Sequence, residues 1–191
     1  MDPPENVVNF GASSADSGSL GTKLTDANIQ TIVQNQITSG KLPLVANGIY
    51  FVLTDKNTTA TSGFCTQYCG WHTNATISGQ AIKYAFVSNP ETQCAAGCGA
   101  NTPSPNGTPG ADAMASILAH ELEETNTDPM GNAWHALSNG MENGDKCAWN
   151  FGTTSTASNG AKYNQTFGGL HYLIQQDWTL LPSQTCAQHY P

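Results

Sequence analysis

The sequence predicts an α+β fold with a small mixed sheet, and three observations support this prediction. Apolar patterns of strands and helices follow one another in the order strand, helix, strand, strand, helix, strand. Six cysteines, an even number, indicate disulfides that pin loops in place. The 191 residues show neither an internal repeat nor a domain boundary. The chain is therefore expected to form a single domain over residues 1–191.

The first part of the chain is expected to contain short strands and one helix. The strands are predicted at residues 6–10, 49–53 and 81–87. The second of these is a continuous apolar run of β-favouring residues, which indicates a buried strand. A loop rich in Gly and Ser over 11–23 precedes Thr25, which is placed to cap a helix. Apolar residues keep helical spacing from there to Gly40, which ends the helix.

The second part is expected to contain one long helix, MASILAHELEETNTD at residues 114–128. Its core-facing stripe is predicted to comprise Met114, Ile117, Leu118 and Leu122. Asp112 is a candidate cap or first-turn acid, and Pro129 stops the helix. The other segments predicted are an irregular stretch at 89–110 pinned by disulfides, a short helix within 131–139, a loop at 152–162 and a strand at 169–178.

The charge of the chain excludes several kinds of partner. The formal net charge is −8, and all six basic residues are lysines. Nucleic-acid binding requires a basic surface, and an anionic membrane surface would repel this chain. No apolar run reaches the 18 or so residues of a membrane-spanning helix. We therefore expect no nucleic acid and no membrane as partner, and we expect a monomer.

The cysteines indicate an oxidising compartment. They are Cys65, Cys69, Cys94, Cys98, Cys147 and Cys186. We expect the first four to pair among themselves and the last two with each other; a zinc site made by the first four is the alternative. Three disulfides in a chain of low charge favour a secreted protein; since the N-terminus lacks the features of a signal peptide, we expect that the signal has been removed. Sequons at Asn57, Asn74, Asn106 and Asn164 are weak support for a glycoprotein.

The residues with catalytic potential gather on the long helix. His120 and Glu124 are four positions apart, so both lie on one helix face, and Glu121 lies between them. The pattern H-E-x-x-E differs by one residue from the zinc-protease signature H-E-x-x-H. A catalytic zinc site needs three protein ligands and one open position. His120 and Glu124 would be two ligands, and Glu121 the general base that takes a proton from water.

The third ligand has two candidates. Glu142 would come from a following element, and Asp128 lies another turn along the same helix. Asp145 is better placed to orient His120. His72 is a candidate further ligand or substrate contact, although a histidine beside a cysteine often only packs near a disulfide.

Acidic residues without counter-charge favour a bound cation. Between Tyr84 and Asp145 there are eight acids and neither Lys nor Arg. Such acids repel one another unless a cation neutralises them. Zinc is the expected cofactor, but a site of two carboxylates and one imidazole is anionic, which keeps Ca or Mn as alternatives. Four tryptophans, Trp71, Trp134, Trp149 and Trp178, are candidates to line a sugar or peptide cleft, although core packing explains most of them.

Several segments occur together in the order of one known family. They are GFCTQYCGWH at 63–72, QCAAGC at 93–98, HELEETNTDPMGNAW at 120–134, ENGDKC at 142–147 and KYN at 162–164. With LGTKLTDANI and GIYFVLTDKN, the chain resembles the EXORDIUM / phosphate-induced protein 1 family over about residues 20–186. The resemblance implies a secreted, cell-wall-associated protein linked in plants to cell expansion and growth signalling. Family members commonly carry a further segment before the region that matches residue 6 onwards.

The H-E-L-x-E core also resembles the helix of zincin metallopeptidases, which implies a zincin-like fold with His120, Glu121 and Glu124 on the active-site helix. Zincins usually have a histidine at the position of Glu124. We expect a secreted zinc-dependent metallohydrolase, a metallopeptidase acting on a peptide or protein substrate. The alternative is a non-catalytic extracellular protein that binds a cell-wall glycan or a receptor, with a structural metal or none.

Overall fold

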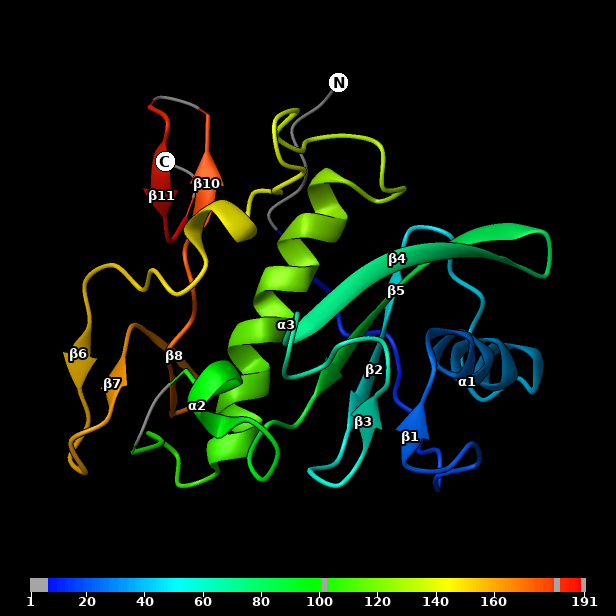
Figure 1. Cartoon of the computed structure of the whole chain (residues 1–191), viewed down its shortest axis with the longest axis horizontal. Helices are drawn as coiled ribbons and strands as arrows, with labels where there is room; N and C mark the ends of the chain where they lie inside the picture. Colours follow the sequence, from blue (N-terminus) through cyan, green and yellow to red (C-terminus); the bar gives the residue numbers. More distant parts are fainter. Residues whose placement is uncertain (1–6, 101–102, 181–182, 190–191) are drawn as a thin grey trace.

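The computed structural model in Figure 1 describes residues 7–100, 103–180 and 183–189. Its largest sheet has three strands in the order β2-β5-β4: β2 (Ile49–Thr54), β5 (Gln80–Ser88) and β4 (Gly70–Ile77). Strand β2 runs parallel to β5, whereas β4 runs antiparallel to it. The helices are α1 (Asp26–Thr38), α2 (Ala95–Cys98), α3 (Pro109–Thr127) and the 3-10 helix η1 (Asp145–Cys147). The predicted α+β class with a small mixed sheet is confirmed.

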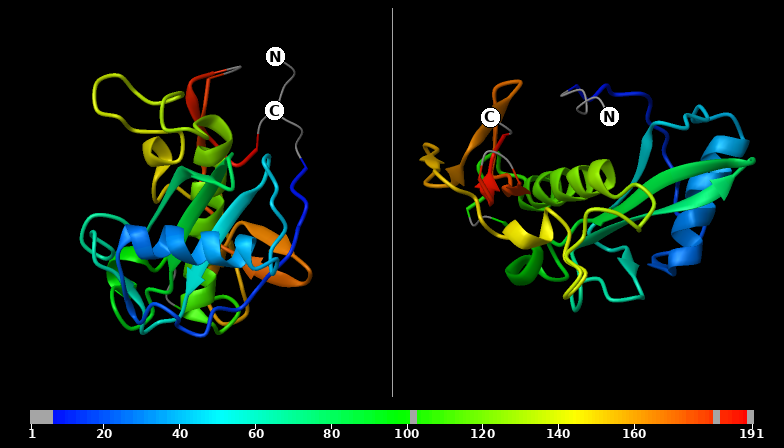
Figure 2. Two further views of the ribbon diagram at one scale, coloured as in Figure 1. Left: turned by 90° about the vertical axis from the view of Figure 1, so that its right-hand side faces the viewer. Right: turned by 90° about the horizontal axis from the view of Figure 1, so that it is seen from above.

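The remaining strands form two-stranded pairs. They are β1 (Lys23–Leu24) with β3 (Thr59–Ala60), β6 (Ser155–Thr156) with β7 (Lys162–Tyr163), β8 (Gln165–Phe167) with β9 (Leu170–Tyr172), and β10 (Asp177–Thr179) with β11 (Thr185–Ala187). Figure 2 shows α1 and α3 on opposite faces of the three-stranded sheet. We call residues 7–98 the N-terminal region and residues 128–189 the C-terminal region; α3 lies between them.

Helix α1 forms as its sequence predicts. Thr25 is the N-cap: its hydroxyl accepts a hydrogen bond from the Asn28 backbone N–H, and the Asn28 side chain accepts one from the Thr25 N–H. Gly40 follows the helix in the left-handed conformation, with φ of 73°. Ile29, Val33 and Ile37 are buried against the sheet in the main apolar core.

Burial in the three-stranded sheet differs from the prediction. Strand β2 exists where expected, but it is an edge strand and Leu53 is 53% exposed. The most buried strand is β5, in which Ile82, Phe86 and Val87 have no solvent exposure. Strand β4 was not predicted, because its sequence, GWHTNATI, carries too few apolar residues to show a strand pattern. This strand matters because it carries His72.

Four other predictions of local structure are wrong. Residues 7–10 form no strand, and residue 6 lies outside the described part of the chain. No helix forms within 131–139, which consists of turns. The single strand expected at 169–178 is two short ones, β9 and β10, and the loop expected at 152–162 contains β6 and the first residue of β7. Strands of two or three residues depend on tertiary partners and leave little pattern in a sequence.

Helix α3 begins at Pro109, five residues earlier than predicted, and ends at Thr127. Of the predicted apolar stripe only Ile117 is buried; Met114, Leu118 and Leu122 are half-buried. The buried positions are instead Gly110, Asp112, Ala113, Ser116, Ile117, Glu121, Glu124 and Thr125. The helix thus buries a face that carries carboxylates, which points to a polar site beneath it.

The six cysteines form three disulfides, Cys65–Cys94, Cys69–Cys98 and Cys147–Cys186. The expected grouping is confirmed, and no thiolate is left for the alternative cysteine zinc site. The first two bonds join the segment after β3 to α2 and so pin the irregular stretch 89–110, as predicted. The described helices include none that is long and apolar enough to cross a lipid bilayer.

Two of the four sequon asparagines use their side-chain amides inside the fold. The Asn106 amide group donates to Asp112 Oδ1 and to the His171 carbonyl, and that of Asn164 donates to the Phe151 carbonyl among others. Asp112 lies in the first turn of α3, as predicted, and its carboxylate also accepts the hydrogen bond from Asn106 in the preceding loop. Attachment of a glycan at either asparagine would break these contacts.

Candidate metal centre

A cavity of about 190 Å³ opens between α3, β4 and the loop that enters η1. These elements also lie beside one another in Figures 1 and 2. The residues lining the cavity are Gly70, Trp71, His72, His120, Glu121, Glu124, Glu142 and Asp145. Four carboxylates and two imidazoles therefore share one small space, and neither Lys nor Arg lines it.

Helix α3 brings His120 and Glu124 together on one face. The distance from His120 Nε2 to Glu124 Oε1 is 3.0 Å. Asp145 lies against both residues: its Oδ1 is 3.7 Å from His120 Nε2, and its backbone N–H donates to Glu124 Oε1 at 3.0 Å. The helical spacing thus brings His120 and Glu124 together, as predicted, and η1 places the carboxylate of Asp145 beside them.

Strand β4 contributes the second histidine from the opposite wall. His72 Nε2 lies 3.1 Å from Glu142 Oε2 and 3.7 Å from Glu124 Oε2. The His72 side chain is 7% exposed. His72, which the sequence proposed only as a candidate, is thus part of the cluster.

Two glycines permit this close packing. A Cβ on Gly70 would lie 2.6 Å from Ile117 Cγ2 and 2.8 Å from Glu121 Oε1. A Cβ on Gly144 would lie 2.9 Å from His120 ring atoms and 3.0 Å from Glu124 Oε1. Distances this short exclude any larger residue unless the backbone moves. Neither glycine was recognised from the sequence, in which both look like ordinary turn or loop residues.

Burial and mutual charge shift the pKa values in the cavity. Burial raises the pKa of Glu121 to about 8. Burial alone would lower the pKa of His120, but the adjacent carboxylates of Asp145 and Glu124 raise it to about 11. Burial likewise favours a lower pKa for His72. The hydrogen bond to Glu142 and the negative charges of Glu142, Glu121 and Glu124 outweigh it, so the pKa of His72 is raised. A cluster without a cation therefore retains protons that a cation would displace.

The donor atoms suit a divalent cation. Donors around an ion at about 2.1 Å lie roughly 3.4 Å apart in a tetrahedral arrangement, and the histidine–carboxylate distances here are 3.0–3.7 Å. Glu142 Oε1 is buried without a hydrogen-bond partner among the described residues. Glu121 is 3% exposed, and its carboxylate faces the same cavity. Buried carboxylate oxygens without donors are costly unless a cation binds them.

Asp128, the rival third ligand, is not in this cluster. It is the C-cap of α3, and its Oδ1 accepts hydrogen bonds from the backbone N–H groups of Asn132 and Ala133. Its Oδ2 lies 3.6 Å from His135 Nδ1. The backbone leaves helical geometry at Asp128, so its side chain does not lie on the same helix face as His120 and Glu124. Glu142 and Asp145 supply the distant carboxylates instead.

Two further acids with raised pKa values lie outside the cavity. Glu123 of α3 is half-buried, and burial raises its pKa. Asp177 on β10 was not identified from the sequence; burial raises its pKa to about 7, and its Oδ1 lacks a hydrogen-bond partner in the described structure. Neither residue lines the cavity.

The four tryptophans do not form a common binding surface. Trp71 lines the cavity and packs against Tyr84 and Phe86. Trp134 and Trp149 are exposed, and Trp178 lies beneath the Lys146 ammonium group.

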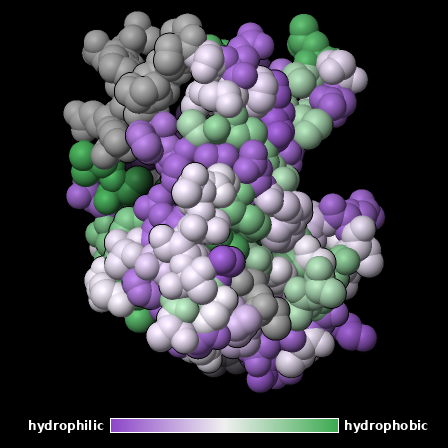
Figure 3. All heavy atoms as spheres, turned by 90° about the vertical axis from the view of Figure 1, so that its left-hand side faces the viewer, coloured by the Kyte–Doolittle hydropathy of each residue, from purple (hydrophilic) through white to green (hydrophobic). Residues whose placement is uncertain are grey.

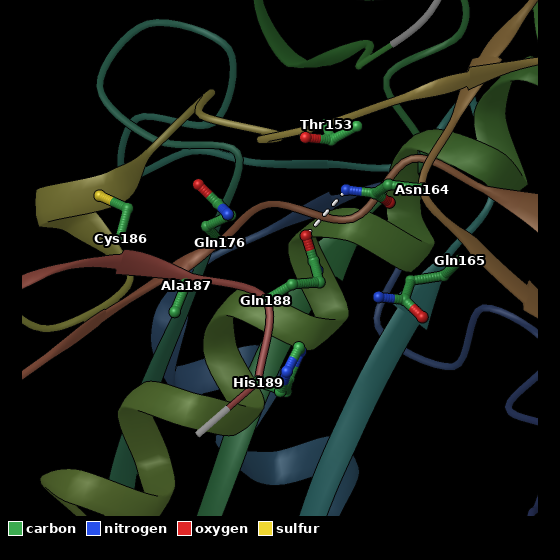
Figure 4. A pocket seen from close by; sticks show the side chains of 8 residues that line it. All are labelled: Thr153, Asn164, Gln165, Gln176, Cys186, Ala187, Gln188 and His189. Carbon is green, nitrogen blue, oxygen red and sulfur yellow. Dashed lines mark hydrogen bonds between the residues drawn. The ribbon is translucent and has the colours of Figure 1, made fainter. Parts of the chain in front are cut away.

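A second, larger cavity of about 570 Å³ lies in the C-terminal region (Figure 4). Its lining residues are Thr153, Asn164, Gln165, Gln176, Cys186, Ala187, Gln188 and His189. The Asn164 amide donates to Gln188 Oε1 across it, as the dashed line in Figure 4 shows. Among the described residues, the lining includes four side-chain amides but no carboxylate, Lys or Arg. Such a cavity suits an uncharged ligand rich in hydroxyl groups.

Comparisons with known proteins agree with the resemblance found in the sequence. The profile described as "Phosphate-induced protein 1 conserved region" matches residues 3–188. Protein EXORDIUM-like 3 of Arabidopsis thaliana is 34% identical over 84% of this chain and 56% of its own length, and EXORDIUM-like 5 is 30% identical over 91% and 56%. Protein PHOSPHATE-INDUCED 1 of Nicotiana tabacum is 37% identical over 47% and 34%.

The chain therefore spans about half the length of the curated relatives it matches. No solved structure matches it significantly.

Proposed function

Because the chain belongs to the phosphate-induced protein 1 family, we propose a function in that setting: a secreted, zinc-dependent hydrolase of the zincin-like type that cleaves peptide bonds. The observation that carries the proposal is the cavity in which His120, Glu121 and Glu124 of α3 meet His72, Glu142 and Asp145. The three disulfides support the extracellular location.

The residues of α3 would have separate roles in metal binding and proton transfer. His120 and Glu124 would hold the ion, with Asp145 as the nearby third donor. A bound ion polarises a carbonyl group and makes a water molecule more acidic. Glu121 would accept a proton from that water and deliver it to the leaving amine. Its pKa of about 8 without a cation falls when positive charge enters the cavity, which leaves the carboxylate ionised as a base.

The open edge of β4 supports a peptide as substrate. In the described structure β4 pairs with β5 alone, so its other edge has backbone groups free to pair with an extended chain. The cavity residues Gly70 to His72 lie at the start of this strand. A peptide paired there would pass directly over the cavity.

Metal analysis of the purified chain is the first test. We expect at least one equivalent of zinc after loading, removable by a chelator, whereas less than about a tenth of an equivalent of any divalent metal would refute the proposal. The Glu121→Gln variant should retain metal but lose at least about 100-fold in hydrolysis of a peptide library. Glu123→Gln, on the same helix but outside the cavity, is the matched control. Full activity of Glu121→Gln would exclude it as the base.

The amide-lined cavity favours a second candidate function, the binding of a neutral cell-wall glycan without catalysis. The side-chain amides of Gln165 and Gln176 line the cavity and form no hydrogen bond within the described part of the chain. Binding on a glycan array that is lost in Gln176→Ala and retained in His120→Ala would support this function over the hydrolase. Loss in neither variant would exclude the cavity as the glycan site.

A further inference from the structure

We propose that the cavity binds two divalent cations, bridged by the carboxylate of Glu124; this inference rests on the proposed metal site and sets its stoichiometry. The two oxygens of Glu124 face different imidazoles. Oε1 is 3.0 Å from His120 Nε2, and Oε2 is 3.7 Å from His72 Nε2. A carboxylate that presents one oxygen to each of two histidines has the arrangement of a bridging ligand.

A single ion cannot reach both histidines in this geometry. Donor atoms bound to one ion at about 2.1 Å lie no more than roughly 4.2 Å apart, even when they face each other across it. The described donor atoms that lie within 4.8 Å of one another form two sets, and neither set contains both histidines. One set is His120, Glu124 and Asp145, and the other is His72, Glu121 and Glu124. Glu124 is common to both.

Each set has enough donors for its own ion. The first ion has His120, Glu124 Oε1 and Asp145. For the second ion, the set provides His72, Glu121 and Glu124. Glu142, whose Oε2 is 3.1 Å from His72 Nε2, lies outside this set. With Glu121 bound to the second ion, its role as general base belongs to the form of the cavity that holds one ion.

Charge balance is compatible with two ions. The four carboxylates of the cavity carry four negative charges when ionised, and no Lys or Arg lines it. Two divalent ions balance all four charges without any proton retained in the cavity. Carboxylate-bridged ion pairs about 3.5–4 Å apart are a common arrangement in hydrolases, where they bind the attacking and leaving oxygens together.

The test counts zinc ions in the full chain by native mass spectrometry and elemental analysis, after chelator treatment, loading with Zn²⁺ and removal of the excess. We expect two equivalents in the unmodified chain, one in His72→Gln, one in His120→Gln and none in Glu124→Ala. His135→Ala is the matched control, because His135 lies outside the cavity, and it should retain two. Circular dichroism identifies variants that fail to fold.

A second readout does not depend on the variants. Loading the unmodified chain with Mn²⁺ should give an electron paramagnetic resonance spectrum of an exchange-coupled pair, because one carboxylate joins the two ions. One equivalent of zinc with an uncoupled spectrum would overturn the two-ion inference and leave the proposed hydrolase standing. No bound metal in the unmodified chain would overturn both.

Discussion

The N-terminal and C-terminal regions are held together by different forces. The main apolar core draws its fully buried residues from positions 24–86, around α1 and the three-stranded sheet. After α3, the buried hydrophobic residues of the described structure are Cys147, Ala161 and Leu173. Figure 3 shows the molecule from the side that carries β6 and β7; hydrophilic and neutral residues dominate there, and hydrophobic ones are scattered.

Side-chain amides take the place of apolar packing in the C-terminal region. Asn164 donates to the Phe151 and Ile174 carbonyls and to Gln188, and it accepts from the Ile174 backbone N–H. Gln175 accepts from the Trp149 backbone N–H. Together with the bond Cys147–Cys186, these contacts order loops that the hydrophobic effect alone would leave loose.

The cavity lies where the two regions meet. His72 comes from the N-terminal region with its apolar core. Glu142 and Asp145 come from the C-terminal region, where side-chain amides form hydrogen bonds to the loops. A rigid sheet can fix one ligand accurately, while loops can adjust to bring the others to an ion. The comparison predicts that truncation of an apolar side chain lowers the free energy of unfolding most in the N-terminal region. It also predicts that metal removal raises hydrogen exchange most in the C-terminal region.

The largest expected effect is that of Phe86→Ala. Phe86 has no solvent exposure and packs against Phe64 and Trp71, so truncation should lower the free energy of unfolding by about 3–5 kcal/mol. The control is Phe167→Ala in the C-terminal region, 61% exposed, which should cost less than about 0.5 kcal/mol. Urea denaturation measures both, and equal losses would contradict the comparison.

Metal removal is expected to have the next largest effect. At free metal about 100-fold above Kd, chelation should cost about 2.7 kcal/mol of stability. Hydrogen exchange should rise in residues 142–147, which carry two candidate ligands, while β5 amides stay protected. The His120→Gln, Glu124→Ala double variant should not respond to the chelator. A uniform rise in exchange over both regions would argue against a local cross-link.

The third prediction concerns the amide network. Asn164→Ala removes the hydrogen bonds of a half-buried amide and should lower the free energy of unfolding by about 2 kcal/mol. Asn57→Ala, at an exposed position, is the matched control and should leave stability within about 0.5 kcal/mol. If both variants denature at the same urea concentration, side-chain amides do not hold the C-terminal region.

The smallest effect is a pH dependence from Asp177. Its folded-state pKa of about 7 lies above its ordinary value of 3.8, so its contribution is fully present below about pH 4 and is lost as pH rises through about 7. Asp177→Asn should therefore be more stable than the unmodified chain at pH 8 by about 1–2 kcal/mol, allowing for solvent screening, and equal to it at pH 4.

Thermal unfolding of metal-free protein across this pH range measures the Asp177 effect. Glu91→Gln is the control, because Glu91 forms an exposed ion pair with Lys56. An unchanged difference between Asp177→Asn and the unmodified chain from pH 4 to pH 8 would show that folding does not raise the pKa of Asp177.

Features that depend on neighbours along the chain were predictable from the sequence. Thr25 and Asn28 cap α1 because a capping box requires only residues three apart. His120 and Glu124 meet because four residues make about one helical turn. The grouping of the cysteines was also predictable, since the first four are close in sequence and the last two are left to pair with each other.

The distant groups that complete the cavity are brought there by long-range packing and could not be predicted from the sequence. Strand β4 is polar and showed no strand pattern, so nothing local placed His72 opposite Glu124. Asp128 looked as suitable as Glu142, but the end of α3 directs it to the N–H groups of the following turn. Gly70 and Gly144 matter because of atoms far away in sequence. Local spacing fixes a helix face, whereas the groups that meet that face are chosen by long-range packing, which no short pattern records.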